Sequence, residues 1–279
     1  MDILLYNPLS SRGKNIKVAE KLKKKLEKKG HEVKVVDLLQ IENVHAFLSN
    51  YKETDRMIIL GGDGTMHRII NSIDIQEVVP QIFMYKAGSG NDFLRSIKSK
   101  TKLVDVKSYL MNLPILTLEH ETRKVLNGAG IGLDGLVAYR VNESKALKNK
   151  SNYFKNSVKS FFQFKPQKVK VIIDGNEMTY NKVYFVSSMY SSYFGGGMKI
   201  APKKKREDQM LQLVVVKDIP KWLLLIMFPT IYIGWHRFLK PYVKIFNGKG
   251  IKVELSEGSY LQVDGETQYP ISSYELKID

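Results

Sequence analysis

The sequence contains no cysteine, so disulfide bonds and thiolate metal sites are excluded, and we expect a reducing, cytoplasmic environment. It also lacks the Walker pattern, GxxxxGK followed by Ser or Thr, which excludes a P-loop NTPase. Zinc-finger spacing and the aromatic-rich strands of RNA-recognition modules are missing too. We therefore expect no nucleic-acid partner.

Long hydrophobic runs are equally scarce. The longest apolar stretch lies between Trp222 and Trp235, contains Pro229 and Gly234, and is too short to span a bilayer. The first eight residues carry no basic region and no long apolar core, so they predict a first strand rather than a signal peptide. Any association with a membrane is therefore expected to be peripheral.

Negative charge is the other scarcity. The 279 residues hold 44 Lys and Arg against 28 Asp and Glu, which gives a net charge of +16. Such an excess calls for an anionic partner, and an anionic membrane face or a phosphorylated small molecule fits it. A basic surface that serves only solubility remains the alternative.

The first part of the chain, residues 1–118, alternates strand and helix patterns. Apolar runs predict strands at Asp2–Tyr6, Glu32–Asp37, Arg56–Leu60 and Gln81–Tyr85, and a helix near residues 16–29 ends at a glycine. Strands that alternate with helices predict a parallel sheet. We expect an α/β N-terminal domain with a parallel Rossmann-like sheet that binds a nucleotide.

The second part, residues 119–270, has a different period. Short apolar runs separated by turns such as Asp174-Gly175-Asn176 predict a mostly antiparallel β-sandwich C-terminal domain. The length of the chain agrees with two domains. We expect this second domain to bind the substrate.

Two glycine turns and one polar loop follow predicted strands. They are Asn7-Pro8-Leu9-Ser10, Gly61-Gly62-Asp63-Gly64-Thr65 and Gly88-Ser89-Gly90-Asn91-Asp92. Parallel strands end at the same edge of a sheet, so these loops are expected to converge. Glycines let the backbone approach a phosphate, and a helix N-terminus attracts anions. An acid such as Asp63 or Asp92 belongs there if Mg²⁺ lies between it and the phosphate, whereas a plain glycine turn is the alternative.

Three further motifs complete a pattern. They are Asn127-Gly128-Ala129-Gly130-Ile131-Gly132, Ala201-Pro202 with Asp208, and Asp264-Gly265-Glu266. In their order and spacing, all these motifs together resemble the diacylglycerol kinase catalytic-domain family, in its bacterial soluble lipid-kinase form. The resemblance implies ATP in an interdomain cleft, γ-phosphoryl transfer to the hydroxyl of a diacylglycerol-like lipid, and a return of residues 271–279 to the first domain.

The resemblance also assigns positions. It implies nucleotide contacts from Asn7, Gly62-Asp63-Gly64-Thr65-Met66-His67-Arg68 and Ser89, a general base at Glu266, and a structural Mg²⁺ site at Lys205, Asp208 and Met210. We assign Asp264 to support of the base and of the metal. A hairpin-turn acid is the alternative for Glu266, and a solvated charged turn is the alternative for Asp208. The chain departs from the family pattern at three places: His67-Arg68 replaces Asn-Glu, Gln209 replaces Gly, and Ser89 replaces Thr.

A lipid kinase must reach an interface, and residues 142–165 place phenylalanines among lysines. We expect this segment to contact an anionic membrane surface, unless its aromatic side chains pack on the sandwich. The stretch Trp222–Trp235 is predicted either to line an acyl-chain groove or to be a buried insertion.

Two other functions stay open from the sequence alone. A soluble small-molecule kinase of the NAD-kinase type shares the Gly-Gly-Asp-Gly-Thr turn, and a non-catalytic lipid- or nucleotide-binding module would tolerate His67-Arg68. A homodimer is kept as an alternative to a single chain.

Overall fold

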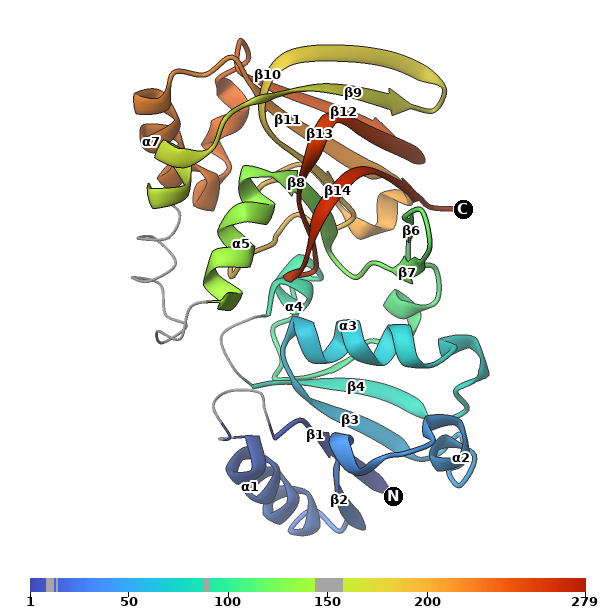
Figure 1. The fold of residues 1–279 in the computed structure, drawn as a ribbon. Coiled ribbons are helices and arrows are strands. Elements are labelled where there is room, and N and C mark those ends of the chain that lie inside the picture. Colours follow the sequence, from blue (N-terminus) through green and yellow to red (C-terminus); the bar gives the residue numbers. More distant parts are fainter. Residues whose placement is uncertain (9–12, 14, 88–90, 144–157) are drawn as a thin grey trace. The chain divides into compact units, whose positions relative to one another are not determined.

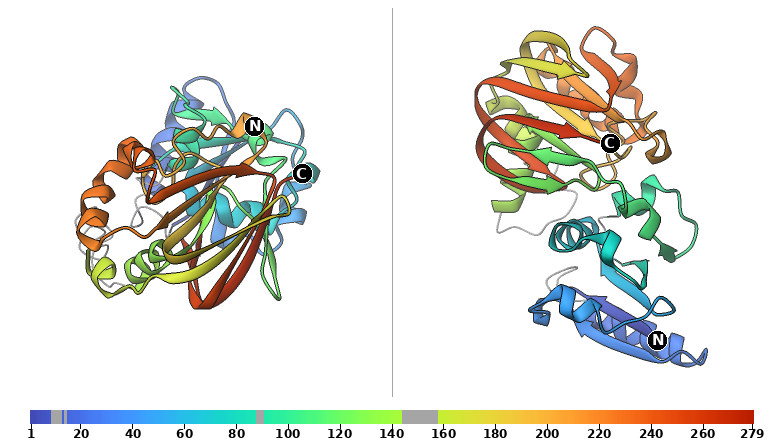
Figure 2. Two further views of the ribbon diagram at one scale, coloured as in Figure 1. Left: turned by 90° about the horizontal axis from the view of Figure 1, so that it is seen from above. Right: turned by 90° about the vertical axis from the view of Figure 1, so that its right-hand side faces the viewer.

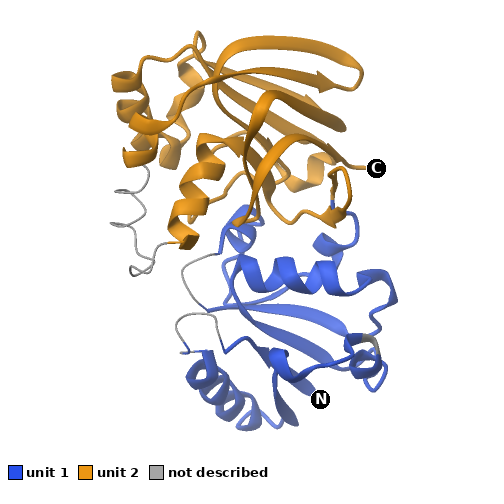
Figure 3. Cartoon of the chain, in the orientation of Figure 1, with its two compact units in different colours: residues 1–113 blue, residues 114–279 orange. Residues whose placement is uncertain are grey.

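The computed structural model describes residues 1–8, 13, 15–87, 91–143 and 158–279. The chain forms two compact units, residues 1–113 and 114–279 (Figure 3). The division falls at Leu113, five residues before the predicted boundary at residue 118. The last residues, which we expected in the first unit, lie in unit 2 instead, because β14 (Glu266–Lys277) pairs there with β13 (Gly250–Val263) and β6 (Ile115–Thr117).

Unit 1 is built on a five-stranded sheet in the order β2-β1-β3-β4-β5 (Figure 1). The strands are β1 (Asp2–Tyr6), β2 (Val33–Asp37), β3 (Arg56–Gly61), β4 (Gln81–Lys86) and β5 (Leu103–Asp105). The first four pair in parallel, and only β5 runs antiparallel. The predicted Rossmann-like sheet is confirmed, and its parallel strands end at one edge as expected.

Alternation along the strands sends side chains to two faces of this sheet. One face, with Leu4, Ile58 and Leu60, packs against Ala19, Leu22 and Leu26 of α1 (Asn15–Glu27), while the lysines of that helix point to solvent. The remaining helices of the unit are α2 (Val44–Leu48), α3 (Asp63–Ser72) and α4 (Asp92–Ser96), with single 3-10 turns η2 (Leu38–Gln40), η3 (Ile75–Glu77) and η4 (Lys107–Leu110).

Unit 2 is built on a nine-stranded antiparallel sheet, as predicted (Figure 2). Besides β6, β13 and β14 it contains β7 (Thr122–Lys124), β8 (Gly128–Gly132), β9 (Gln167–Ile173), β10 (Asn176–Met189), β11 (Leu211–Lys217) and β12 (Val243–Gly248). The long strands β10 and β13 each pair with β8 near one end and with β9 near the other. β8 and β9 therefore each lie between the two long strands, at opposite ends of them.

Helices cover the apolar core of unit 2. They are α5 (Leu133–Glu143), η5 (Arg206–Asp208), α7 (Lys221–Thr230), η6 (Ile231–Ile233) and η7 (Trp235–Phe238). Leu224, Met227 and Phe228 of α7 pack with side chains of β10 and β11, so the stretch Trp222–Trp235 is buried in part, while its two tryptophans are exposed. Of the segment 142–165, residues 144–157 lie outside the described part. No helix among the described residues is long and apolar enough to cross a membrane.

Candidate nucleotide site and catalytic residues

The turn between β3 and α3 has the geometry of an anion site. A Cβ added to Gly61 would lie 2.5 Å from the Thr65 side chain, so only glycine fits there. Gly62 is the N-cap residue of α3, and no side-chain hydrogen bond caps this helix. The first turn of α3 therefore offers its backbone N–H groups and the positive end of the helix dipole to an anion.

Asp63 joins the two glycine turns. Its Oδ2 accepts a hydrogen bond of 2.8 Å from the backbone N–H of Asp92, and its Oδ1 accepts one of 3.0 Å from that of Phe93. The carboxylate thus caps α4 from the neighbouring turn. Asp92 is buried and forms an ion pair of 2.5 Å between its Oδ1 and Nη1 of Arg95. Both acids that we expected to serve Mg²⁺ are engaged within the protein.

The end of β1 is tied to the same turn. Asn7 Nδ2 lies 3.5 Å from Thr65 Oγ1, and Asn15 donates to the carbonyl oxygens of Leu60 and Asn7 over 3.2 and 3.4 Å. The loops after β1, β3 and β4 therefore meet, as the parallel order requires. The remaining predicted positions of these loops, Ser10, Gly88, Ser89 and Gly90, lie outside the described residues.

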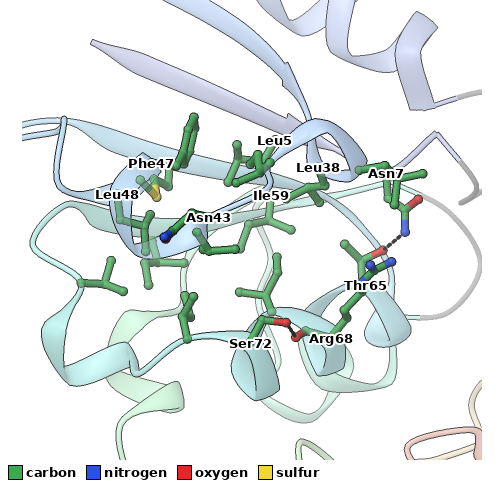
Figure 4. Close-up of a pocket in the computed structure, with 18 of the residues that line it drawn as sticks. Leu5, Asn7, Leu38, Asn43, Phe47, Leu48, Ile59, Thr65, Arg68 and Ser72 are labelled. Atoms are coloured by element: carbon green, nitrogen blue, oxygen red, sulfur yellow. Dashed lines mark hydrogen bonds between the residues drawn. The ribbon is translucent and has the colours of Figure 1, made fainter.

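A cavity of about 410 Å³ opens beside this junction. Figure 4 shows Asn7 and Thr65 at one end of it and Phe47 and Leu48 at the opposite end. Its walls are mainly apolar and come from the sheet face opposite α1, from α3, and from the segment after β2: Leu5, Met57, Ile59, Ile69, Ile73, Leu38, Leu39, Ile41 and Val44. We did not predict the wall at residues 38–48, although it follows a strand that ends at the same edge.

The side chains of His67 and Arg68 lie in different surroundings. The side chains of Met66 and His67 are buried, so of the expected nucleotide contacts these two turn into the interior. Arg68 is exposed, lines the cavity, and lies on the same helix as Thr65. Arg68 thus brings a positive charge to the polar end of the cavity.

In unit 2, Asp264 fixes the backbone around the predicted base. Its Oδ2 accepts from the N–H of Leu126 at 2.7 Å, and its Oδ1 accepts from Asn127 at 2.7 Å and Gly128 at 3.2 Å. The residue itself adopts a left-handed conformation, with φ of 51°. Asp264 is therefore a positioning residue that joins the β13–β14 turn to the start of β8.

Glu266, at the start of β14, presents its carboxylate to solvent. Its side chain is 58% exposed, and Oε2 lies 3.7 Å from Nη1 of Arg123. A carboxylate that is accessible and held beside an arginine can accept a proton from a hydroxyl group that binds next to it.

The predicted Mg²⁺ site at Lys205, Asp208 and Met210 has a surrounding that fits a divalent cation poorly. Asp208 Oδ2 accepts from the backbone N–H of Lys205 at 3.1 Å, within the capping box of η5. The buried ammonium group of Lys204 donates to the carbonyl oxygen of Lys205. The described residues include no cluster of three or more His, Asp or Glu side chains suited to a metal ion.

Asp134 is a candidate that the sequence did not single out. It is partly buried at the start of α5, and desolvation raises the pKa of its carboxyl group to about 7, although Ser187 and the N–H of Gly135 donate to it. A Cβ at Gly130 would lie 1.7 Å from Asp134 Oδ2, so the glycine makes room for the acid. Asp134 also lines a small apolar cavity of about 30 Å³ with Phe161, Leu224 and Phe228. In the sequence, the position of this acid directly after the glycine-rich strand β8 could have pointed to it.

Each of the two units matches a family profile. Residues 2–125 match the family profile described as diacylglycerol kinase catalytic domain. Residues 128–274 match the profile described as YegS C-terminal NAD kinase beta sandwich-like domain. The chain therefore belongs to the diacylglycerol kinase catalytic-domain family, which makes it a member of a family of kinases.

Named relatives agree with this assignment. A diacylglycerol kinase of Mycobacterium tuberculosis is 24% identical over 283 residues, which cover 96% of this chain and 89% of the relative. A diacylglycerol kinase of Bacillus subtilis is 24% identical over 272 residues, which cover 94% and 88%. The solved structure of a diacylglycerol kinase from Bacillus anthracis covers 99% of this chain and 93% of its own, with a TM-score of 0.60 at 17% identity, which shows the shared fold.

Proposed function

We propose that the protein is an ATP-dependent lipid kinase that transfers the γ-phosphoryl group to the hydroxyl of a diacylglycerol-like lipid and requires Mg²⁺. The observation that carries the proposal is the junction in unit 1, where two glycine turns are joined by Asp63 beside an apolar cavity. The names of the relatives support a diacylglycerol-like acceptor.

The cavity suggests how ATP binds. Its apolar walls suit a nucleobase, and its volume of about 410 Å³ falls in the range of small-molecule sites. With the base inside, the triphosphate extends past Asn7 and Thr65 to the N-terminus of α3. Arg68 then offsets part of the phosphate charge, a role that does not need the acid usual at this position of the family.

The proposed transfer uses few protein groups. The oxygen of the lipid hydroxyl forms a bond to the γ-phosphorus, the bond between that phosphorus and the bridging oxygen of ADP breaks, and the hydroxyl proton passes to the carboxylate of Glu266. Mg²⁺, when bound to ATP, neutralises the β- and γ-phosphate oxygens. Asp264 holds the turn that carries Glu266, and Asp63 holds the turns that bind phosphate.

Labelled ATP tests the proposal directly. The protein is incubated with γ-labelled ATP and a total lipid extract, and the labelled product is identified by chromatography. We expect label in a phospholipid, and Glu266→Gln is expected to lower turnover by about 100-fold or more while ATP affinity is kept. Glu257→Gln, an exposed glutamate on β13, is the matched control and should retain turnover.

Other outcomes point to the alternatives. Label that enters NAD instead of lipid would favour a soluble kinase of the NAD-kinase type, whose sandwich the second profile is named after. ATP binding without transfer to any lipid or to NAD would favour a binding module. If Glu266→Gln keeps turnover within a few-fold of the unchanged protein, the general base lies elsewhere.

A further inference from the structure

Large apolar side chains gather on the outside of α7, η6 and η7. We call them the α7 patch: Phe162, Trp222, Ile226, Tyr232, Ile233, Trp235 and Phe238, each between 39% and 64% exposed. The three elements follow one another in the chain and contact each other (Figure 1). An exposed apolar cluster of this size marks a surface that binds something.

The packing of α7 against unit 2 keeps the α7 patch exposed to solvent. Leu224, Met227 and Phe228 bury the inner face of α7, so Trp222 and Ile226, one helical turn apart, share the outer face. The left-handed Gly234, with φ of 77°, turns the chain between η6 and η7. A Cβ at that glycine would lie 2.7 Å from Pro202 Cβ, so the turn is anchored against unit 2.

Cations surround the patch, and acids are missing. Lys221, Arg237 and Lys240 lie in or next to these elements, and Lys221 Nζ donates to the carbonyl oxygen of Phe162 at 2.8 Å. The sequence contains no aspartate or glutamate from Ile219 to Val253. In a symmetric dimer formed through the patch, the cations of one copy would face the same cations of the other copy and repel them. Anionic lipid headgroups would instead neutralise these cations.

We propose that the α7 patch is the surface by which the protein docks on an anionic membrane. Its aromatic and aliphatic side chains enter the headgroup region, and the cations contact lipid phosphates. The inference names the docking surface for the proposed lipid kinase and gains its biological sense from that function. Of residues 142–165, which we expected to contact the membrane, Phe162 belongs to this patch, and residues 144–157 lie outside the described part of the chain.

The two tryptophans make the test direct, because they are the only ones in the chain and both belong to the patch. The protein is titrated, without ATP, with vesicles of phosphatidylcholine and phosphatidylglycerol. We expect a blue shift of tryptophan emission, and quenching when the lipid acyl chains carry bromine. Sedimentation of the same vesicles measures affinity independently.

Paired variants keep both probes. Ile226→Asp with Ile233→Asp adds two acids to the patch and is expected to weaken vesicle binding by about tenfold or more. Val79→Asp with Met111→Asp makes the same change at exposed apolar positions of unit 1 and should bind as the unchanged protein does. Thermal melting confirms that each variant is folded.

Two results would overturn the docking surface. Vesicles that sediment with the protein while the tryptophan emission stays unshifted would place the membrane contact elsewhere. An emission shift that depends on protein concentration without vesicles, together with dimer formation, would assign the patch to a second copy. Because the assay contains no ATP, its failure leaves the kinase proposal untouched, and a failed kinase assay leaves the vesicle result standing.

A separate observation concerns Lys204. This lysine is 4% exposed, donates to the carbonyl oxygen of Lys205, and has its Nζ 4.0 Å from Asp208 Oδ2 and 5.5 Å from the ring centre of Tyr190. Two of the three groups that the family resemblance assigns to Mg²⁺, the Lys205 carbonyl and the Asp208 carboxylate, thus face an ammonium group.

We infer that the ammonium group of Lys204 takes the place of the structural Mg²⁺ in this chain. A divalent ion between these groups would lie within a few ångströms of the ammonium and be repelled by it. The lysine supplies the positive charge without a metal.

Removal of the lysine should create the metal site. In the absence of ATP, we expect Mn²⁺ to bind Lys204→Ala, detected by electron paramagnetic resonance, and Mg²⁺ to raise the melting temperature of this variant. Lys203→Ala removes the same charge from an exposed neighbour and should gain neither response. Lys204→Ala with Asp208→Asn should lose both responses again.

If Lys204→Ala is poorly folded without metal, recovery of folding on addition of Mg²⁺ supports the inference, and Lys204→Met provides a folded version for the Mn²⁺ measurement. Binding of Mn²⁺ to the unchanged protein without ATP, abolished by Asp208→Asn, contradicts the inference. So does a folded Lys204→Met that binds no metal.

Discussion

Asp63 and Asp264 lie in the two most informative motifs, and the carboxylates of both accept hydrogen bonds from backbone N–H groups. Each accepts N–H groups from a segment distant in the chain with both carboxylate oxygens. Hydrogen bonds to a charged acceptor are stronger than those between neutral groups. The two acids therefore position the two glycine turns of unit 1 and the turn that carries the proposed base.

Asp63→Asn tests this role. Its carboxamide can accept with only one oxygen, so the N–H of Asp92 or of Phe93 loses its partner. We expect unit 1 to lose about 1–3 kcal/mol of unfolding free energy, measured by urea denaturation, with a weaker ATP affinity by calorimetry. Asp105→Asn, at an exposed cap of the same unit, is the control and should cost less than about 1 kcal/mol.

Asp134 predicts a pH dependence of stability. Its pKa is raised from about 4 in the unfolded chain to about 7 in the fold, so between these values only the unfolded chain releases the proton. The free energy of unfolding should fall as pH rises through this window, by up to about 4 kcal/mol. Asp134→Asn should lack this part of the fall, measured by urea denaturation at several pH values. Parallel pH curves for the two proteins would refute the raised pKa.

At the scale of elements, Gly61 and Gly64 in the turn from β3 to α3 have different surroundings. Gly61 is needed because the side chain of Thr65 packs against it. Gly64 has open space around its Cα, within helix α3. The sequence shows the same residue type at both positions, and only packing distinguishes them.

The two glycines predict stability changes of opposite sign. Gly61→Ala should destabilise unit 1 by about 1–3 kcal/mol, because the added Cβ overlaps Thr65. Gly64→Ala should be neutral or stabilise by up to about 1 kcal/mol, because alanine favours a helix and meets no neighbour. Denaturant midpoints of both variants provide the comparison, and equal losses would contradict the packing argument.

At the scale of the whole molecule, the net charge of +16 sets how the protein meets an anionic surface. Charge of one sign attracts the protein over a distance of about one Debye length, which shortens from about 10 Å at 0.1 M salt to about 3 Å at 1 M. Apolar contacts made by the α7 patch depend little on salt, so both contributions can be separated.

Vesicle binding should therefore respond to salt in two parts. Raising ionic strength from about 0.1 M to about 1 M is expected to weaken binding to phosphatidylglycerol vesicles by about tenfold or more, without abolishing the tryptophan shift at high lipid concentration. Vesicles of phosphatidylcholine alone serve as the control and should bind weakly at every salt concentration. Binding that ignores salt would show that charge has no part in it.

The sequence by itself determined the features that depend on neighbours along the chain. Apolar periods of two and of about 3.6 residues indicated the parallel sheet and the antiparallel sandwich, and glycine turns after strands indicated where the loops of unit 1 converge. The matching motifs indicated the kinase family before any fold was known. These signals are local, because backbone geometry and side-chain alternation act over a few residues.

Tertiary structure decided which partner each polar group meets and which apolar face stays exposed. The carboxylate of Asp63 accepts from N–H groups 29 and 30 residues further on, and the buried ammonium group of Lys204 faces the Lys205 carbonyl and the Asp208 carboxylate. The sequence of the apolar stretch around Trp222 does not show which of its side chains are buried and which are exposed. Only packing against β10 and β11 buries one of its sides and leaves the other to water, because burial depends on what the fold brings together.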